Sequence, residues 1–312
     1  MATAYVLGAT GHAGSYMVPV LCDAGYEVTA VSRGNREPYT KDMPQWKNVK
    51  RISASRDEAI PMIAKAHPDV IVDLIAYTVD DMKKLCEALY AEGGYENTRL
   101  IFTGSVWIFD KKFYAPCDEE HPRTAEDAYG RGKAEIAAYL HEQYREKGLK
   151  ATTLHPGHIC GKGWIPVGPT GNRDPGVLKD IMAGRQVVLP GHGNATLAHV
   201  HSEDIARLAA ACLQNDVSID QEFISACADA ITLYGFAAKL YKYYGHEPNI
   251  AYASYEDFMA ALSEEDRRAS MEHIDRCPLV TMAKAEKLLG FKPKYSDWET
   301  VIESIESIKD TL

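Results

Sequence analysis

The sequence contains no long apolar run and no block of basic residues. No stretch of about 18 uncharged apolar side chains occurs, which is the length that a membrane-spanning helix requires. The first residues also lack the pattern of a signal peptide. The formal net charge is −10 and no polybasic tract stands out. We therefore expect no membrane segment, and we expect nucleic acid to be a poor partner.

The seven cysteines include no C-x-x-C pair, and their number is odd. This usage is typical of reduced thiols in a cytosolic protein and argues against a disulfide framework. His155, His158, His199 and His201 stand in two close pairs, but no carboxylate or cysteine completes a set at the spacing of a metal site. We therefore predict a cytoplasmic protein, no metal, and structural roles for these histidines other than His158.

The first half of the chain alternates short apolar runs with amphipathic segments. This alternation is typical of an α/β fold in which helices cover both faces of a parallel sheet. The predicted strands are residues 4–7, 27–32, 49–53, 70–75, 100–104, 150–154 and 222–225. The predicted helices are residues 15–24, 56–66, 79–90, 129–147, 176–183, 202–213 and 298–308. Ligands of such sheets bind at the carboxyl ends of the strands.

Three glycines follow the first predicted strand, at Gly8, Gly11 and Gly14. A strand, a glycine turn and a helix N-terminus form a site for a pyrophosphate, because free backbone N–H groups and the helix dipole face the ligand. The spacing is G-x-x-G-x-x-G rather than the G-x-G-x-x-G of many dehydrogenases. An ordinary strand-to-helix turn is the alternative, but the strand at 27–32 completes a βαβ unit.

The end of the second predicted strand carries no carboxylate. Proteins that prefer NAD place an Asp or Glu there to bind the ribose diol. This chain has Ser32, Arg33 and Arg36 instead. Guanidinium groups suit a 2′-phosphate, so the loop favours NADP over NAD. The alternative is a solvated loop with two surface arginines.

A candidate catalytic set combines a strand end with a helix. Tyr129 and Lys133 form a Y-x-x-x-K pair on one helical face, and Thr103 ends the fifth strand. A free tyrosine titrates near pH 10. A nearby ammonium and a positive nicotinamide ring would lower the pKa of Tyr129, which could then exchange a proton with a substrate hydroxyl or carbonyl. A surface helix pair is the common alternative.

The glycine motif, the hydroxyl residue at the end of the fifth strand and the Y-x-x-x-K pair, in this order, resemble the extended short-chain dehydrogenase/reductase superfamily. Within this superfamily, the chain resembles the NAD-dependent epimerase/dehydratase family. Residues 102–107 are similar to the family's S-S-x-x-V-Y segment, and residues 155–161 are similar to R-P-G-x-V-Y-G. The other similar segments are residues 73–77, 198–206 and 288–293. The resemblance covers nearly the whole chain.

The resemblance implies a Rossmann-type doubly wound parallel sheet with a smaller C-terminal α+β substrate lobe. We expect a dinucleotide-binding domain at 1–156, with its sheet completed by about 196–226. We expect the substrate-binding lobe at 157–195 and 227–312. Relatives dimerise through two helices, which correspond to residues 77–90 and 129–147 here, so a homodimer is expected.

The resemblance also implies roles for individual residues. Tyr129 is the acid/base, Lys133 orients the nicotinamide ribose, and Thr103 or Ser105 binds the reacting oxygen. The three glycines cradle the pyrophosphate together with Thr10, His12 and Ala13. The implied cofactor contacts at the nicotinamide and its ribose are Leu74, Ile75, Ala76, Tyr77, Pro156, Gly157 and His158.

Several residues depart from the family pattern. His155 replaces the usual arginine, and Trp107 is bulkier than the usual residue and would narrow the cleft. No acidic residue follows Thr103 directly, which argues against a sugar 4,6-dehydratase. His158 is a candidate substrate contact beside the nicotinamide. Asn172 and Arg173 either bind a diphosphate or are solvated.

The predicted function is therefore an NAD(P)-dependent epimerase/dehydratase-type enzyme. Its substrate is a nucleotide sugar or another small molecule with a polar carbonyl or hydroxyl group. One alternative is an NADPH-dependent carbonyl reductase. An alternative of another class is a non-catalytic protein of the same fold that binds RNA or senses a dinucleotide.

Overall fold

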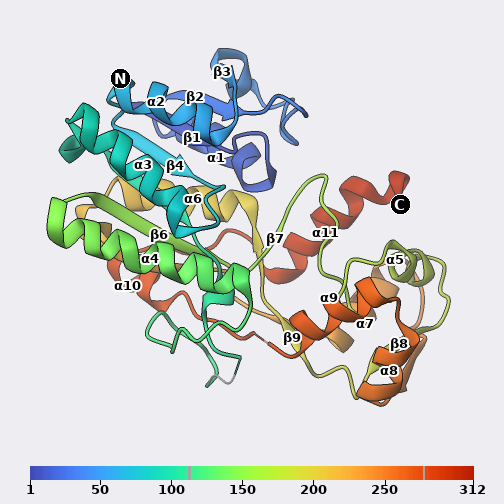
Figure 1. The fold of residues 1–312 in the computed structure, drawn as a ribbon. Coiled ribbons are helices and arrows are strands. Elements are labelled where there is room, and N and C mark those ends of the chain that lie inside the picture. The colour runs from blue at the N-terminus through green and yellow to red at the C-terminus, as the bar shows by residue number, and fades with distance from the viewer. Residues whose placement is uncertain (112–113, 277) are drawn as a thin grey trace.

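A seven-stranded parallel sheet forms the centre of the computed structural model, which describes residues 1–111, 114–276 and 278–312. The strand order is β11-β6-β5-β4-β1-β2-β3 (Figure 1). The strands are β1 (Thr3–Leu7), β2 (Glu27–Ser32), β3 (Lys50–Ser53), β4 (Val70–Asp73), β5 (Arg99–Thr103), β6 (Lys150–Pro156) and β11 (Gln221–Ser225). Every residue of β4 is buried, as expected for a central strand covered on both faces.

Two helical layers enclose the sheet, as Figure 1 shows. On one side, α2 (Arg56–Ala66), α3 (Val79–Glu92) and α4 (Ala128–Lys147) pack in one apolar core. On the other side, α1 (His12–Asp23), α6 (Ser202–Leu213) and α10 (Ala283–Leu289) pack in a second core. The predicted doubly wound Rossmann-type sheet is therefore confirmed. The dimer interface on α3 and α4 stays a prediction.

Local sequence signals explain where these helices begin and end. Ser55 and Glu58 form a capping box at the start of α2, and Asp127 caps α4 by accepting a bond from the amide of Gly130. Gly148 ends α4 in the left-handed conformation that glycine favours. The first helix begins at His12, three residues before the predicted start, because the glycine turn leads into it directly.

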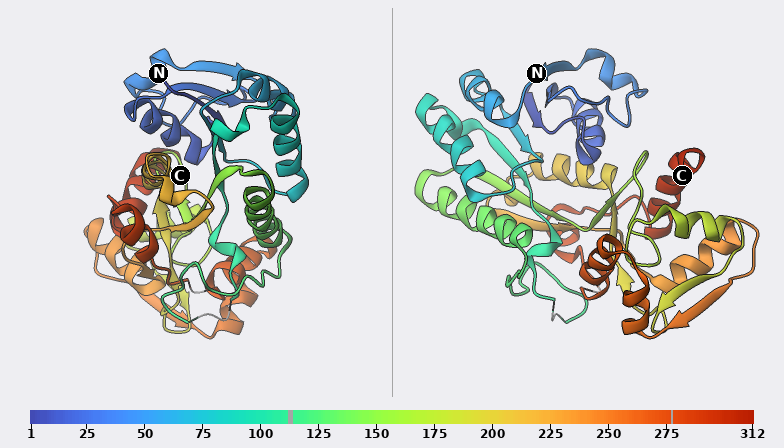
Figure 2. Two further views of the ribbon diagram at one scale, coloured as in Figure 1. Left: turned by 90° about the vertical axis from the view of Figure 1, so that its left-hand side faces the viewer. Right: turned by 45° about the vertical axis from the view of Figure 1, so that its right-hand side comes forward.

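A smaller lobe lies beside the sheet and has its own apolar core. In the right-hand view of Figure 2, its orange and yellow-green elements lie away from the blue N-terminal strands. Its helices are α5 (Pro175–Met182), α7 (Leu233–Tyr243), α8 (Tyr255–Ala261), α9 (Glu264–Ile274) and α11 (Asp297–Ile308). The remaining strands pair in twos: β7 (His158–Cys160) with β10 (His199–His201), β9 (Thr196–Leu197) with β12 (Ile231–Thr232), and β8 (Val187–Pro190) with β13 (Ile250–Ala253). Short 3-10 helices cover Pro44–Asn48, Tyr95–Asn97, Val106–Ile108, Asp216–Ser218 and Lys309–Thr311.

The C-terminal part of the chain returns to the sheet. Met282, Ala285 and Phe291, on and beside α10, are buried in the core that contains α1 and α6. Within residues 196–226, β11 joins the large sheet, whereas β9 and β10 pair with other strands. The predicted domain boundaries stay a prediction. The C-terminal region contributes both to the core around α1 and α6 and to the core of the smaller lobe.

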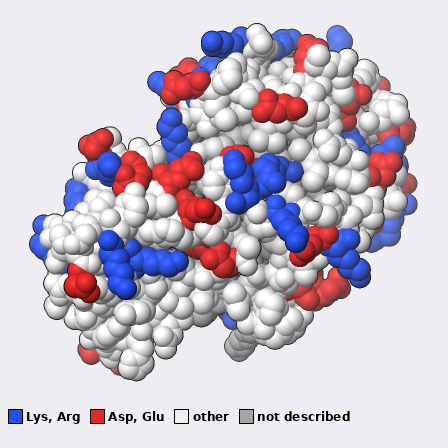
Figure 3. Space-filling model, turned by 180° about the vertical axis from the view of Figure 1, so that it is seen from behind, with Lys and Arg blue, Asp and Glu red and all other residues white. Residues whose placement is uncertain are grey.

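Charges of both signs are interspersed over the face shown in Figure 3, where a small basic group is bordered by acidic side chains. Among the described residues, we find no helix with the length and apolarity needed to cross a bilayer. The described cysteines are free thiols at positions 22, 86, 117, 160, 212 and 227. Cys277, the seventh, lies outside the described residues.

Candidate active site

The site lies where the strand order reverses, between β1 and β4. At such a reversal, the loops that follow neighbouring strands diverge and leave a crevice at the carboxyl end of the sheet. Here the crevice holds two adjoining cavities of about 670 and 540 Å³. The residues that line both cavities are Gly8, Gly11, Arg33, Arg36, Ile75 and Tyr77.

The glycine-rich turn forms a cradle that admits no side chains. Gly8 has φ +86°, and a Cβ there would lie 2.7 Å from Cγ2 of Ile75. A Cβ on Gly14 would lie 2.2 Å from the carbonyl oxygen of Gly8. Gly14 therefore lets α1 pack closely on the end of β1, and the start of α1 faces the cavity. This geometry fits the pyrophosphate of a dinucleotide.

The second cavity lies against the end of β2 and is lined by Ser32, Arg33 and Arg36, as well as Thr10. The Arg36 guanidinium donates to the hydroxyl of Tyr39 at 3.0 Å. The guanidinium of Arg33 makes no hydrogen bond or ion pair with the described chain. An exposed, unpaired guanidinium at this place is free to bind an anion.

Arg56 is a residue of this cavity that the sequence analysis missed. Its guanidinium is buried and forms an ion pair with Asp73, at 2.7 Å. One of its terminal nitrogens has no hydrogen-bond partner among the described residues. The carboxylate of Asp73 in turn accepts bonds from the amides of Ile75 and Ala76. The pair therefore fixes the loop after β4, which lies between the two cavities.

Lys133 lies at the bottom of the larger cavity and is 2 % exposed. Its ammonium donates to the carbonyl oxygens of Thr103, at 2.7 Å, and Ala76, at 2.8 Å. It also lies 4.8 Å from the ring centroid of Phe102. Burial lowers its pKa to about 8. Because an ammonium has three donors, one remains after these two bonds.

Tyr129 stands on the cavity wall and is 40 % exposed. The ammonium of Lys133 lies 5.8 Å from its ring centroid. Burial raises the pKa of Tyr129, although a hydrogen bond with Ser105 acts in the opposite direction. The predicted lowering of this pKa by Lys133 together with a positive nicotinamide ring stays a prediction.

The two candidate hydroxyls at the end of β5 differ in their contacts. Thr103 is buried, and its hydroxyl has no hydrogen-bond partner among the described residues. The hydroxyl of Ser105 accepts a bond from the amide of Trp107 at 3.1 Å. Both residues line the cavity with Tyr129 and Lys133. An unpaired buried hydroxyl is unfavourable by itself, so Thr103 is ready to bind a polar ligand atom.

His158 faces the cavity from the lobe side and differs from the other histidines. It is 6 % exposed, and neither ring nitrogen has a hydrogen-bond partner in the described chain. Its ring lies 4.8 Å from that of His273 on α9. Burial keeps its pKa well below the usual range. By contrast, His155, His199 and His201 all have carboxylate partners, in agreement with structural roles. No described group of three His, Cys, Asp or Glu side chains is arranged to hold a metal ion.

Most of the predicted site residues come together in the two cavities, but two do not line them. Ala76 contributes only its carbonyl oxygen to Lys133. Asn172 is buried, donates to Ser270 at 3.1 Å and accepts from Thr170 at 2.8 Å. These bonds hold the loop before α5 together, so the predicted substrate contact of Asn172 is replaced by a packing role. Arg173, its neighbour, does line the larger cavity.

The lobe supplies a wall that sequence motifs did not reveal. The cavity-lining residues of α9 are Glu265, Arg268, Ala269, Glu272 and His273. Trp164 also lines the cavity and stacks on His12, with ring centroids 4.7 Å apart. Trp164 and the residues of α9 are far from each other and from Tyr129 in sequence. Only the folded chain therefore identifies this wall.

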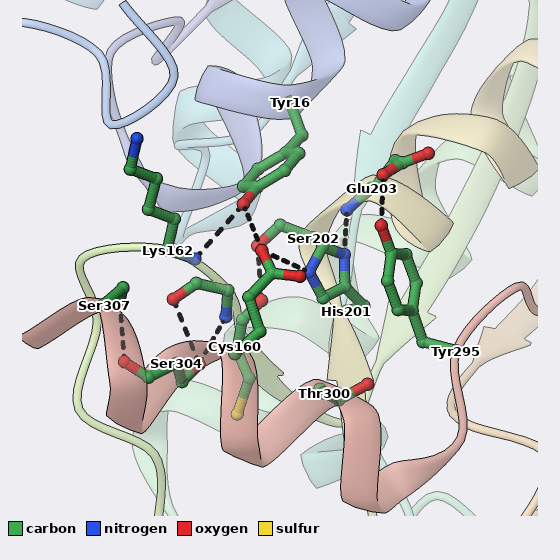
Figure 4. A network of polar contacts seen from close by, with 12 residues as sticks. Tyr16, Cys160, Lys162, His201, Ser202, Glu203, Tyr295, Thr300, Ser304 and Ser307 are labelled. Carbon is green, nitrogen blue, oxygen red and sulfur yellow. Dashed lines mark hydrogen bonds and ion pairs between the residues drawn. The ribbon is translucent and has the colours of Figure 1, made fainter.

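Hydrogen bonds from backbone amides to side-chain hydroxyls hold the segment before Trp164 in place, as Figure 4 shows. The amides of Gly161 and Gly163 donate to Ser304 and Ser307 on α11, both at 2.7 Å. The amide of Lys162 donates to the hydroxyl of Tyr16 on α1 at 3.1 Å. This segment therefore connects the lobe to the helix that follows the glycine turn.

The sequence model of the NAD dependent epimerase/dehydratase family matches residues 4–225. No curated protein sequence matches this chain. Among solved structures, UDP-glucose 4-epimerase from Thermotoga maritima is 20 % identical over 99 % of both chains, with a TM-score of 0.75. UDP-N-acetylglucosamine 4-epimerase from Methanobrevibacter ruminantium is 17 % identical over 100 % of this chain and 99 % of its own, with a TM-score of 0.77. dTDP-glucose 4,6-dehydratase from Bacillus anthracis is 16 % identical over 100 % of this chain and 97 % of its own, with a TM-score of 0.75. At these identities, the structural similarity establishes the fold.

Proposed function

Because the chain belongs to the NAD-dependent epimerase/dehydratase family, we propose that it is an enzyme that epimerises a nucleotide sugar with the Tyr129–Lys133 pair. The observation that carries this proposal is the convergence of Tyr129, Lys133 and the Thr103 hydroxyl in the cavity that also contains the glycine cradle. The matching structures include enzymes named for nucleotide sugars, which supports this substrate class.

The proposed cofactor site uses the glycine turn for the pyrophosphate and the second cavity for the adenosine half. When bound, the nicotinamide supplies a hydride acceptor and donor. The remaining N–H of Lys133 is available for a ribose hydroxyl. In its phenolate form, Tyr129 takes the proton of the substrate hydroxyl as the carbinol is oxidised, and the resulting phenol returns that proton to the oxygen when the carbonyl is reduced. The unpaired hydroxyl of Thr103 holds the same oxygen in place.

The lobe side of the cavity is proposed to hold the rest of the substrate. Arg173 and Arg268 line this side, and the Arg173 side chain has no ion pair or hydrogen bond with the described chain. A guanidinium in such a position suits the diphosphate of a nucleotide sugar. His158 supplies a neutral N–H donor toward the sugar.

We predict that Arg33 and Arg36 select NADP over NAD. Replacing both with glutamine should raise the Kd for NADP⁺ by about a hundredfold or more, because each of the two charge-assisted hydrogen bonds contributes roughly 1.5–3 kcal/mol. The Kd for NAD⁺ should stay within about twofold, since NAD⁺ lacks the 2′-phosphate. Calorimetric titration of cofactor-stripped protein measures both values. Arg51→Gln is the control, because Arg51 pairs with Glu37 outside both cavities. Equal losses for NADP⁺ and NAD⁺ would contradict the assignment.

The same loop favours a second candidate function, an NADPH-dependent carbonyl reductase. An epimerase keeps its cofactor and returns the hydride to the other face of the substrate carbon, whereas a reductase must release its cofactor. The first experiment is therefore absorbance and mass measurement of cofactor on the purified protein, followed by NMR of UDP-glucose and UDP-N-acetylglucosamine incubated with it. Retained cofactor and 4-epimer formation support the epimerase. Rapid NADP(H) exchange with no epimer, and NADPH oxidation by carbonyl compounds, would replace it with the reductase.

A further inference from the structure

A buried carboxylate behind the active site takes part in none of the steps above. Glu222 on β11 is 3 % exposed. One of its oxygens lies 2.6 Å from Nε2 of His141 and 2.6 Å from a guanidinium nitrogen of Arg123. Its other oxygen lies 2.5 Å from Nε2 of His155. Burial acts to raise the pKa of Glu222, but the bonds from the two histidines outweigh burial and hold it well below its usual range.

The contacts of His155 determine which ring nitrogen carries its proton. The amide of Ser105 lies 3.3 Å from Nδ1 of His155 and can only donate, so Nδ1 accepts. The proton is therefore on Nε2, directed at Glu222. Burial lowers the pKa of His155, in agreement with a neutral ring. A ring rotation would break both bonds at once, so Glu222 fixes the orientation of the imidazole.

The same ring supports the chain at the end of β5. A Cβ on Gly104 would lie only 2.4 Å from Nδ1 of His155, so this position accepts no side chain while the imidazole is present. The amide of Gly104 donates to the carbonyl oxygen of Leu154 at 2.7 Å. Gly104, which stands where sugar 4,6-dehydratases have an acidic residue, and His155, which replaces the usual arginine, are thus parts of one arrangement.

We propose that Glu222 and His155 are positioning residues that hold the Thr103–Ser105 segment in its place beside Tyr129. Each residue of the segment is held by a different partner. The ammonium of Lys133 donates to the carbonyl oxygen of Thr103, and the amide of Gly104 donates to β6. The amide of Ser105 donates to His155. Ser105 is 6 % exposed, so without His155 its amide would lack a partner in a buried position. The catalytic consequence rests on the proposed function, whereas the structural consequence does not.

The test compares His155→Phe with His141→Gln in the full-length protein. His141 contacts the same carboxylate but not the segment, so it controls for loss of the Glu222 cluster. We expect His155→Phe to speed hydrogen exchange of the Ser105 amide at least tenfold. With the nucleotide sugar that the wild type converts, we expect kcat to fall at least tenfold while KM and the Kd for the cofactor change less than twofold. His141→Gln should change none of these values more than twofold.

Imidazole ¹⁵N NMR of the wild type adds a measurement that needs no variant to fold. It should show neutral His155 with the proton on Nε2, and a proton on Nδ1 would overturn the proposal. Unchanged Ser105 exchange in His155→Phe, or an equal loss of kcat in His141→Gln, would also overturn it. If the wild type converts no nucleotide sugar, the proposed function fails, while the tautomer and the exchange rates still decide whether His155 holds the segment.

Discussion

Replacing Tyr129 with phenylalanine should lower kcat by about a thousandfold, within the range that positioned acid–base groups contribute. The phenol of Tyr129 is the proposed proton acceptor in the cavity that Thr103 and Lys133 also line, so its removal leaves the substrate hydroxyl without that acceptor. The cofactor cradle is on other residues, so the Kd for NAD(P)⁺ should change less than threefold. Steady-state kinetics and calorimetric titration measure the two quantities.

Tyr77→Phe is a matched control for this variant. Tyr77 lines the same cavity, and its ring lies 6.2 Å from that of Tyr129. We expect its kcat to stay within about threefold of the wild type. If Tyr129→Phe keeps more than a tenth of the wild-type kcat, another group moves the proton and the proposed mechanism is wrong.

Replacing Lys133 with methionine should lower kcat about a hundredfold or more and weaken cofactor binding about tenfold. The variant removes the remaining N–H donor at the bottom of the cavity and the link between the ends of β5 and β4. A hydrogen bond from a charged group contributes roughly 1.5–3 kcal/mol, which corresponds to about tenfold or more in affinity. Calorimetric titration with NADP⁺ and steady-state kinetics test both effects.

The effect of Lys133→Met on stability should be small by comparison. Two carbonyl oxygens lose their partner, at roughly 1–3 kcal/mol each. Against this, the variant removes a buried ammonium whose net unfavourable environment lowers its pKa from 10.5 to about 8, which corresponds to about 3 kcal/mol. The free energy of unfolding in urea should therefore change by about 3 kcal/mol or less. Lys147→Met, at the exposed end of α4, is the control for losing a lysine from this helix. A variant that keeps both cofactor affinity and kcat would exclude Lys133 from the site.

The sequence by itself determined the features that depend on local patterns. Apolar periodicity located the strands and helices of the large sheet, and capping residues such as Ser55 and Asp127 place the helix starts. The glycine turn and the Y-x-x-x-K pair are also local, because a turn and one helical face are each fixed by a few consecutive residues. For this reason the fold class and the family were predicted correctly, while the roles of the site residues stay predictions.

The tertiary structure alone decided the features that depend on contacts between distant parts of the chain. It places Trp164 on His12, brings α9 into the cavity wall, and buries Asn172 away from the cavity. It also directs the ammonium of Lys133 to two carbonyl oxygens. Burial raises the pKa of Tyr129. The burial of a side chain and its charged partners both depend on neighbours that are far apart in sequence, as the contact between Glu222 and His155 illustrates. A local pattern indicates which groups are present, whereas the packed structure decides what each of them faces.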